Sequence, residues 1–170
     1  MIEMRVMGIA LDTRTGSPIV VLNDKDNRKA LPIWIGSAEA SAIIRKIENI
    51  PSTRPMTHDL FIQIAQKTGF EIARVEINDV DDATYFASVI MFNSELQKEI
   101  EIDSRPSDAI AIALRADVPI YVTTTVMAAG MVSTDVEKDE QEAAEFKNFI
   151  QDIKPSDFEK LLKKNFESDQ

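Results

Sequence analysis

The stretch EIDSRPSDAIAIALR, residues 101–115, decides the fold because it joins a strand to a helix through one short charged turn. Ile100 and Ile102 alternate with acidic residues, which is the spacing of a half-buried strand. Arg105 and Pro106 end that strand, and the segment AIAIAL that follows is entirely apolar. A helix that is apolar on all sides is buried in the core of a protein. The stretch therefore predicts a core helix with a charged entrance.

The segments on either side of this stretch predict strands and helices that do not alternate regularly. Two helices are expected, with Ser37 and Thr57 as their N-caps, and residues 125–132 predict a brief helical turn. The segments with strand-like composition are residues 2–12, 18–24, 28–35, 71–78, 84–92, 97–103 and 118–122. The three strands before the core helix predict an antiparallel meander. We therefore expect an α+β fold, in which helices pack on an antiparallel-dominated mixed sheet.

A change of composition near Ser133 divides the chain into two parts. Residues 1–132 are long enough for one hydrophobic core. Residues 133–170 hold eleven acidic residues against six lysines, so this part is strongly acidic. An apolar stripe at helical spacing runs through it from Ala143 to Ile153. We expect an α+β domain followed by an acidic, amphipathic helical tail that folds back or meets a partner.

The residue content excludes several kinds of site. The chain has no cysteine, which excludes disulfides, thiolate zinc sites and cysteine nucleophiles. With one histidine, any metal site must consist mostly of carboxylates and water, which are the ligands of Mg²⁺ or Mn²⁺. No segment approaches the roughly 20 apolar residues of a membrane span, and the N-terminus lacks the pattern of a signal peptide. We expect a cytoplasmic protein with no membrane association.

The net charge of −10 argues against a protein that coats nucleic acid, because non-specific binding depends on neutralising phosphates. It does not exclude a local basic site. An acidic enzyme can act on a phosphodiester when divalent ions bridge the like charges. Nucleic acid therefore stays among the partners that the sequence allows.

The turn between the strand and the core helix is the first candidate site. Asp103, Arg105 and Asp108 lie around the start of a helix, where unpaired N–H groups and the positive end of the helix dipole favour anions. Such a group could hold a divalent ion or a phosphate. The structural alternative is that Asp108 complements the dipole and Arg105 forms an ion pair that fixes the turn. Ion-pair networks of this kind are common, so the sequence alone favours that alternative.

A second Arg-Pro turn, RPMTHDL at residues 54–60, contains the single histidine. His58 at the start of a helix could act as a general base, oriented by Asp59 or a backbone carbonyl, and the alternative is a surface histidine. Arg54 and Arg105 each precede a proline and could bind phosphate, although a pair with an acidic residue is the commoner use. Glu39, in the first turn of the preceding helix, is either a metal ligand or a partner of the helix dipole.

Three strings together resemble the bifunctional nuclease domain family: LPIWIGSAEASAI at 31–43, RPMTHDL at 54–60 and IDSRPSDAIAIALR at 102–115. They occur in the family's order, and the likeness spans about residues 1–130. The resemblance implies a bacterial member with a compact α+β domain that is usually oligomeric. Plant members of the family act on both DNA and RNA, and the activity of bacterial members is inferred from them. The family positions present in this chain are Glu39, Arg54, His58, Asp59, Asp103, Arg105 and Asp108.

With this resemblance, the candidate residues predict a metal-assisted nuclease that hydrolyses phosphodiester bonds of DNA or RNA. We expect His58, Asp59 and Asp108 to be catalytic and Arg54 and Arg105 to bind the substrate phosphate. This mechanism requires the two Arg-Pro turns to meet in space.

One or two Mg²⁺ or Mn²⁺ ions would assist this reaction by activating water and offsetting charge repulsion. The expected metal ligands are Asp103 and Asp108, with Glu39 or Asp59 as further ligands. We expect a homo-oligomer, most simply a dimer, because of the family resemblance and the apolar stripe of the tail.

The alternative is a non-catalytic oligomeric domain that binds a small anion or a protein partner. In that case the Arg-Pro turns are structural ion pairs and the tail is an interface. The acidic charge of the chain favours this alternative, whereas the family resemblance favours the nuclease.

Overall fold

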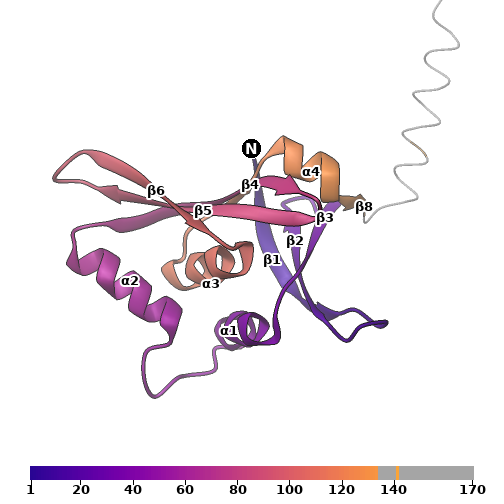
Figure 1. Ribbon diagram of the computed structural model, residues 1–170, viewed down its shortest axis with the longest axis horizontal. Helices are drawn as coiled ribbons and strands as arrows, with labels where there is room; N and C mark the ends of the chain where they lie inside the picture. Colours follow the sequence, from indigo (N-terminus) through magenta and orange to yellow (C-terminus); the bar gives the residue numbers. More distant parts are fainter. Residues whose placement is uncertain (134–140, 142–170) are drawn as a thin grey trace, which may run out of the picture. The chain divides into compact units, whose positions relative to one another are not determined.

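The computed structural model describes residues 1–133 and residue 141, and within them it contains one mixed sheet and four helices (Figure 1). The elements are β1 (Ile2–Leu11), β2 (Pro18–Asp24), β3 (Lys29–Trp34), α1 (Ser37–Ile47), α2 (Thr57–Lys67), β4 (Glu71–Asp81), β5 (Thr84–Asn93), β6 (Lys98–Ser104), α3 (Pro106–Ala116), β7 (Ile120–Val122), α4 (Thr124–Gly130) and β8 (Val132–Ser133). The predicted α+β fold is confirmed.

The sheet has eight strands in the order β6-β5-β4-β7-β1-β2-β3-β8. It consists of two antiparallel meanders, β1–β2–β3 and β4–β5–β6, so the predicted meander is confirmed. The short strand β7 joins them, since Ile120 pairs antiparallel with Met4 and parallel with Val75. The β4–β7 pair is the parallel contact that makes the sheet mixed. A three-residue strand has no local signal for its neighbours, so this junction was not predicted.

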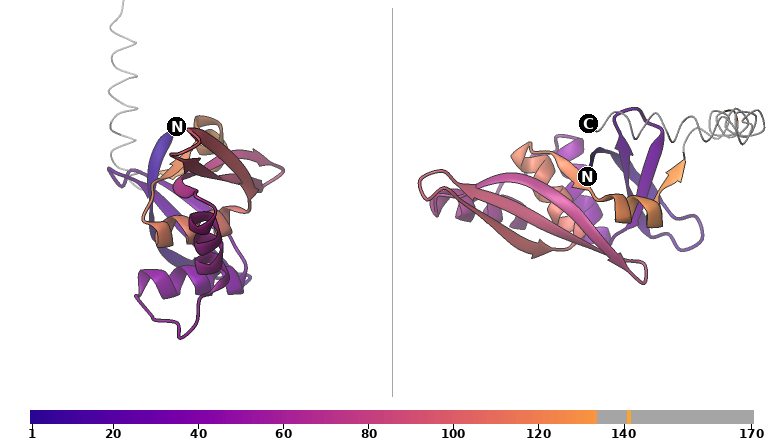
Figure 2. Two further views of the ribbon diagram at one scale, coloured as in Figure 1. Left: turned by 90° about the vertical axis from the view of Figure 1, so that its left-hand side faces the viewer. Right: turned by 90° about the horizontal axis from the view of Figure 1, so that it is seen from above.

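Helices α1, α2 and α3 lie along one face of the sheet, and α4 lies on the other (Figures 1 and 2). The apolar segment 109–113 of α3 is buried, with no residue more than 5% exposed, which confirms the predicted core helix. Its beginning follows from two local constraints. Arg105 is extended (φ −69°, ψ 145°), as a residue before proline prefers, and Pro106 occupies the first helical position, where no N–H is needed.

The N-caps of α1 and α2 differ from the prediction. Gly36 and Met56 are the caps, and Ser37 and Thr57 are the first helical residues, so neither hydroxyl caps its helix. At α2 the carboxylate of Asp59, the third helical residue, takes that role: its Oδ2 accepts a hydrogen bond from the Met56 N–H at 2.8 Å. The side chain of Asp59 is thereby committed to the helix start.

The folded unit continues to the end of β8, because Ser133 pairs with Lys29 of β3. The contacts within residues Met1–Thr134 make them one compact unit. The helical stripe predicted between Ala143 and Ile153 lies outside the described residues. Within residues 1–133 and 141, every helix is too short or too polar to cross a membrane.

Candidate active site

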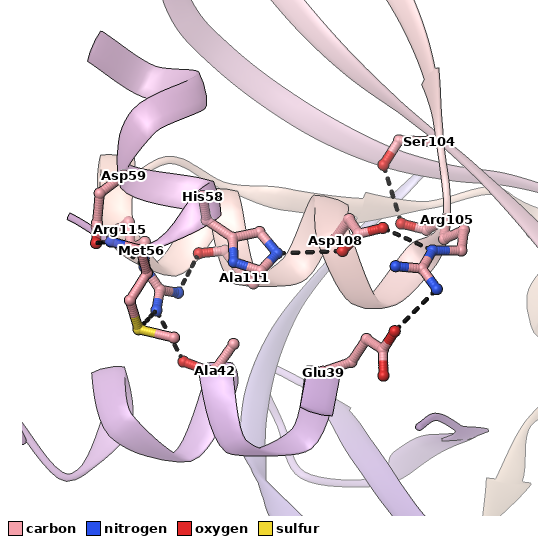
Figure 3. A network of polar contacts seen from close by, with 10 residues as sticks. All are labelled: Glu39, Ala42, Met56, His58, Asp59, Ser104, Arg105, Asp108, Ala111 and Arg115. Carbon is pink, nitrogen blue, oxygen red and sulfur yellow. Dashed lines mark hydrogen bonds and ion pairs between the residues drawn. The ribbon is translucent and has the colours of Figure 1, made fainter. Parts of the chain in front are cut away.

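The two Arg-Pro turns meet. His58 in the first turn of α2 and Asp108 in the first turn of α3 are 50 residues apart in the chain, yet His58 Nε2 lies 3.1 Å from Asp108 Oδ1 (Figure 3). The His58 side chain is 13% exposed and that of Asp108 is 29% exposed. The geometric requirement of the predicted site is therefore met.

Two further contacts extend this pair into a chain that we call the Asp108 network: Glu39, Arg105, Asp108 and His58. The Arg105 guanidinium donates through Nε to Asp108 Oδ2 at 2.7 Å and through Nη1 to Glu39 Oε1 at 2.8 Å. Glu39 comes from α1, so the network ties together α1, α2 and α3 (Figure 3). Arg105 is the most accessible member, with 66% of its side chain exposed.

The network keeps Asp108 ionised. Burial alone would raise the pKa of this carboxyl, but the hydrogen bonds from Arg105 and His58 outweigh burial and lower the pKa below its usual value. The same contact, with a smaller contribution from Glu39, raises the pKa of Arg105. Because an ionised carboxylate only accepts hydrogen bonds, His58 Nε2 must carry the proton between them. The other ring nitrogen, His58 Nδ1, is buried and has no hydrogen-bond partner among the described residues.

A pocket of about 290 Å³ lies beside the network. All four network residues line it, together with Ala38, Ala42, Met56 and Thr57. On the far side of the Glu39–Arg105 pair is a second pocket of about 350 Å³, which is also lined by Trp34 and Tyr85. Trp34 is 54% exposed. An accessible guanidinium thus lies between a histidine–carboxylate pair and the exposed ring of Trp34.

Asp59 does not take part in this network. One of its oxygens accepts from the Met56 N–H, and the other pairs with Arg115 Nε at 3.2 Å. The orienting carboxylate of His58 is Asp108, whereas Asp59 points to the other side of α2 (Figure 3). The predicted role of Asp59 beside His58 is therefore corrected. Consecutive helical residues face different directions, so only one of the two could reach α3 at this point.

Asp103 lies on the opposite face of the sheet from Asp108. In the β5–β6 pair it is opposite Ser88, so the two side chains share a face, while the pair Met91 and Ile100, which alternation places on the other face, packs in the core. Asp103 and Asp108 therefore do not form a joint metal site. Strand alternation continues to the end of β6, and the helix then starts on the other side of the sheet.

The donor set does not fit a preformed metal site. Within the part of the chain that the structure describes, no three histidine, aspartate or glutamate side chains come together as possible ligands. Glu39 and Asp108 are separated by the Arg105 guanidinium, which pairs with both. A resident Mg²⁺ or Mn²⁺ ion would have to displace that guanidinium, so we derive no step through a metal.

Arg54 lies in a different pocket from Arg105. This larger pocket, of about 540 Å³, is lined by Arg45, Lys46, Arg54, Met56 and Arg115, among others. Met56 also lines the pocket beside the Asp108 network, so the two pockets are neighbours. The two arginines that the sequence places at one phosphate thus lie in adjacent pockets.

The sequence reading missed Arg115, which organises this region. Its side chain is 7% exposed and donates to the carbonyl oxygens of Ala111 and Ala42, both at 2.9 Å (Figure 3). Together with the ion pair to Asp59, these contacts join α1, α2 and α3. One sequence feature could have revealed this role: Arg115 stands at the end of an otherwise apolar helix, where its side chain cannot avoid partial burial.

Comparison with known proteins shows which family the chain belongs to. Residues 20–135 match the bifunctional nuclease domain, and that range contains every residue of the Asp108 network. The chain belongs to the bifunctional nuclease domain family. It is 36% identical over 165 residues to an uncharacterized protein of Mycobacterium tuberculosis, in a match that covers 92% of this chain and 97% of that protein. The family predicted from the three sequence strings is confirmed.

Plant members of the family are also similar. The chain is 32% identical to Bifunctional nuclease 2 of Oryza sativa subsp. japonica and 29% identical to Bifunctional nuclease 1 of Arabidopsis thaliana. Both matches cover 62% of this chain and 33% of the plant protein. The similarity thus spans about a third of each plant nuclease.

Proposed function

We propose that this chain is a nuclease that hydrolyses phosphodiester bonds of DNA or RNA at the Asp108 network. The observation that carries the proposal is the His58–Asp108–Arg105 contact, at 3.1 and 2.7 Å, on the wall of a pocket of about 290 Å³. It combines a group that can move a proton, a carboxylate that orients it and an exposed guanidinium that can bind a phosphate. These are the components of phosphoryl chemistry.

Arg105 is the group that meets the substrate first. Its Nε and Nη1 are used by Asp108 and Glu39, which leaves Nη2 and the outer edge of the guanidinium for a phosphate oxygen. A phosphate at this position competes with the carboxylates of Asp108 and Glu39 for the positive charge of Arg105. As Arg105 turns toward the phosphate, Asp108 loses one of its two hydrogen bonds and pairs more strongly with His58.

In the resting arrangement His58 Nε2–H donates to Asp108, so the ring nitrogen that accepts the proton of the attacking group is Nδ1. Nδ1 is buried, so the His58 side chain must move to bring this atom to the substrate. The attacking group is a water molecule, or in RNA the neighbouring 2′-hydroxyl, and its oxygen bonds to phosphorus while the P–O bond to the leaving sugar oxygen breaks. His58 takes the proton of the attacking group and returns a proton to the leaving oxygen, and a cyclic phosphate formed from the 2′-hydroxyl is then opened by water. Asp108 stabilises the positively charged imidazole between the two proton transfers.

A non-catalytic anion-binding domain is the second candidate, and one observation favours it. Both oxygens of Asp108 are already paired, and Glu39 pairs with Arg105. A network satisfied in this way is also what a structural ion-pair cluster requires. In that case Arg105 would hold a small anion without any bond being broken.

The deciding experiment measures release of labelled fragments from single-stranded RNA and single-stranded DNA by purified protein, with and without Mn²⁺. His58→Ala and Asp108→Asn are expected to lose at least 100-fold in rate, the usual effect of removing a general acid or base. Asp82→Asn is a matched control, since Asp82 lies in the exposed β4–β5 turn and asparagine tolerates its positive φ. Equal rates in all four proteins would identify a contaminating nuclease and contradict the proposal.

Three finer expectations accompany the proposal and stay predictions. They are the assistance of Mg²⁺ or Mn²⁺, a cytoplasmic location and assembly into a dimer. The absence of cysteine suits a reducing compartment but does not require one.

A further inference from the structure

The pocket that contains Arg54 has a charge opposite to that of the chain as a whole. The chain carries a net charge of −10, with 19 lysines and arginines. Four of those cations, Arg45, Lys46, Arg54 and Arg115, line this one pocket of about 540 Å³, and Asp59 is its single carboxylate. We call it the cationic pocket. At physiological salt the remaining acidic side chains are screened beyond about 8 Å, so an anion in the pocket experiences mainly these cations.

The four cations of this pocket differ in how available they are to bind a ligand. Arg115 is buried, and its charge is offset by Asp59. Arg45 uses Nη2 to hold the loop before α2, through Pro51 O at 2.8 Å and Ser52 Oγ at 3.3 Å. By contrast, Lys46 and Arg54 are exposed and make no ion pair with any described residue. The pocket thus has a fixed cationic floor and two free cations at its rim.

The cationic pocket lies at the other end of the same helices as the Asp108 network. Helix α1 carries Glu39 in its first turn and Lys46 in its last, and α3 carries Asp108 in its first turn and Arg115 in its last. Seven residues of helix separate each pair, which corresponds to about 10 Å. One phosphate group cannot reach both ends. Two phosphates of one strand can, because Met56 is the shared wall between the pockets.

We infer that the cationic pocket binds a second phosphate of a single-stranded nucleic acid whose neighbouring phosphodiester lies at Arg105. This inference rests on the proposed function, since it assigns a substrate subsite next to the reacting bond. Lys46 and Arg54 contact the phosphate, Arg45 and Arg115 supply the fixed positive field, and Asp59 keeps Arg115 in place. Because the backbone phosphates are the ligand, the subsite accepts DNA and RNA alike.

Binding, measured apart from cleavage, tests this inference. The probes are fluorescein-labelled single-stranded DNA and RNA 12-mers, followed by fluorescence anisotropy in EDTA between 50 and 200 mM salt, with gels to verify that the probe is intact. The test variant is Lys46→Gln/Arg54→Gln. The matched control is Lys67→Gln/Lys98→Gln, which changes the net charge equally at two exposed positions outside the pocket.

The Lys46→Gln/Arg54→Gln variant is expected to bind both probes about tenfold more weakly, and its plot of log K against log salt should be flatter by about 1.4, the value for two lost contacts to a single strand. The control should change affinity less than twofold. Equal affinity and equal salt dependence in wild type and test variant would overturn the inference, even if cleavage continues. Tight binding by the wild type without any cleavage would refute the proposed function and leave the subsite supported.

Discussion

Replacing Arg115 with methionine tests the interaction that joins the three helices beneath the site. The Arg115 side chain is 7% exposed. Methionine keeps most of the aliphatic stem but removes the guanidinium. Two charge-assisted bonds are lost, to Ala111 O and Ala42 O, together with the ion pair to Asp59. The Asp59 side chain is 36% exposed, so water can solvate its carboxylate and compensates much of the lost ion pair.

The magnitude follows from these contacts. Each bond to a charged group contributes about 1.5–3 kcal/mol, and a partly exposed ion pair adds less than about 1 kcal/mol. Against this, methionine avoids the cost of burying a guanidinium, and both carbonyl oxygens lie in helices where they can keep a backbone partner. We expect the free energy of unfolding to fall by about 2 kcal/mol. With a urea m-value of about 2 kcal/mol/M, the unfolding midpoint shifts by about 1 M.

Urea unfolding followed by far-ultraviolet circular dichroism measures this shift. Arg14→Met is the control, because the Arg14 side chain is 87% exposed and its Nε is 3.9 Å from Asp12 Oδ1. The control should change stability by less than about 0.5 kcal/mol. An Arg115→Met midpoint within about 0.2 M of the wild-type value would refute the reasoning, since it would mean that the guanidinium contributes no more than an exposed one.

Three further predictions concern the site. The pKa of Asp108 is lowered in the folded protein, so its stabilising contribution is complete above the unfolded value of about 3.9 and is lost as pH falls through the lower folded value. The difference in free energy of unfolding between wild type and Asp108→Asn, measured in urea, should therefore become smaller from pH 5 to pH 2.5. A constant difference would contradict the ion pairing. Since residues 1–133 and 141 hold no three-ligand cluster, calorimetry without nucleic acid should find no Mn²⁺ site tighter than about 1 mM that depends on Asp108. Micromolar Mn²⁺ binding that Asp108→Asn abolishes would contradict this prediction. Trp34 is exposed beside Arg105 and should stack on an unpaired base. Trp34→Ala should therefore weaken binding of a single-stranded 12-mer by about 1–3 kcal/mol in an anisotropy titration. Unchanged affinity would exclude this contact.

Local pattern was sufficient for most of the secondary structure. The strands of both meanders, the two surface helices and the buried helix α3 have clear periodicity or composition, and their bounds differ from the prediction by a few residues. The N-caps were placed one residue late, because serine and threonine favour a cap only statistically. Gly36 is also a favoured cap but stands beside Ser37, and Met56 carries no such signal. The parallel contact of β7 was missed because three residues do not specify a neighbour.

By itself, the sequence determined that two Arg-Pro turns open helices, that the helix 106–116 is buried, and which family the chain belongs to. These features depend on neighbouring residues, whose spacing the backbone fixes. Only the tertiary structure decided which charges meet. It brought His58 to Asp108, turned Asp59 toward Arg115, placed Asp103 on the far face of the sheet and gave Arg54 a pocket of its own. An ion pair forms through space, and its partners are set by how α1, α2 and α3 pack on the sheet.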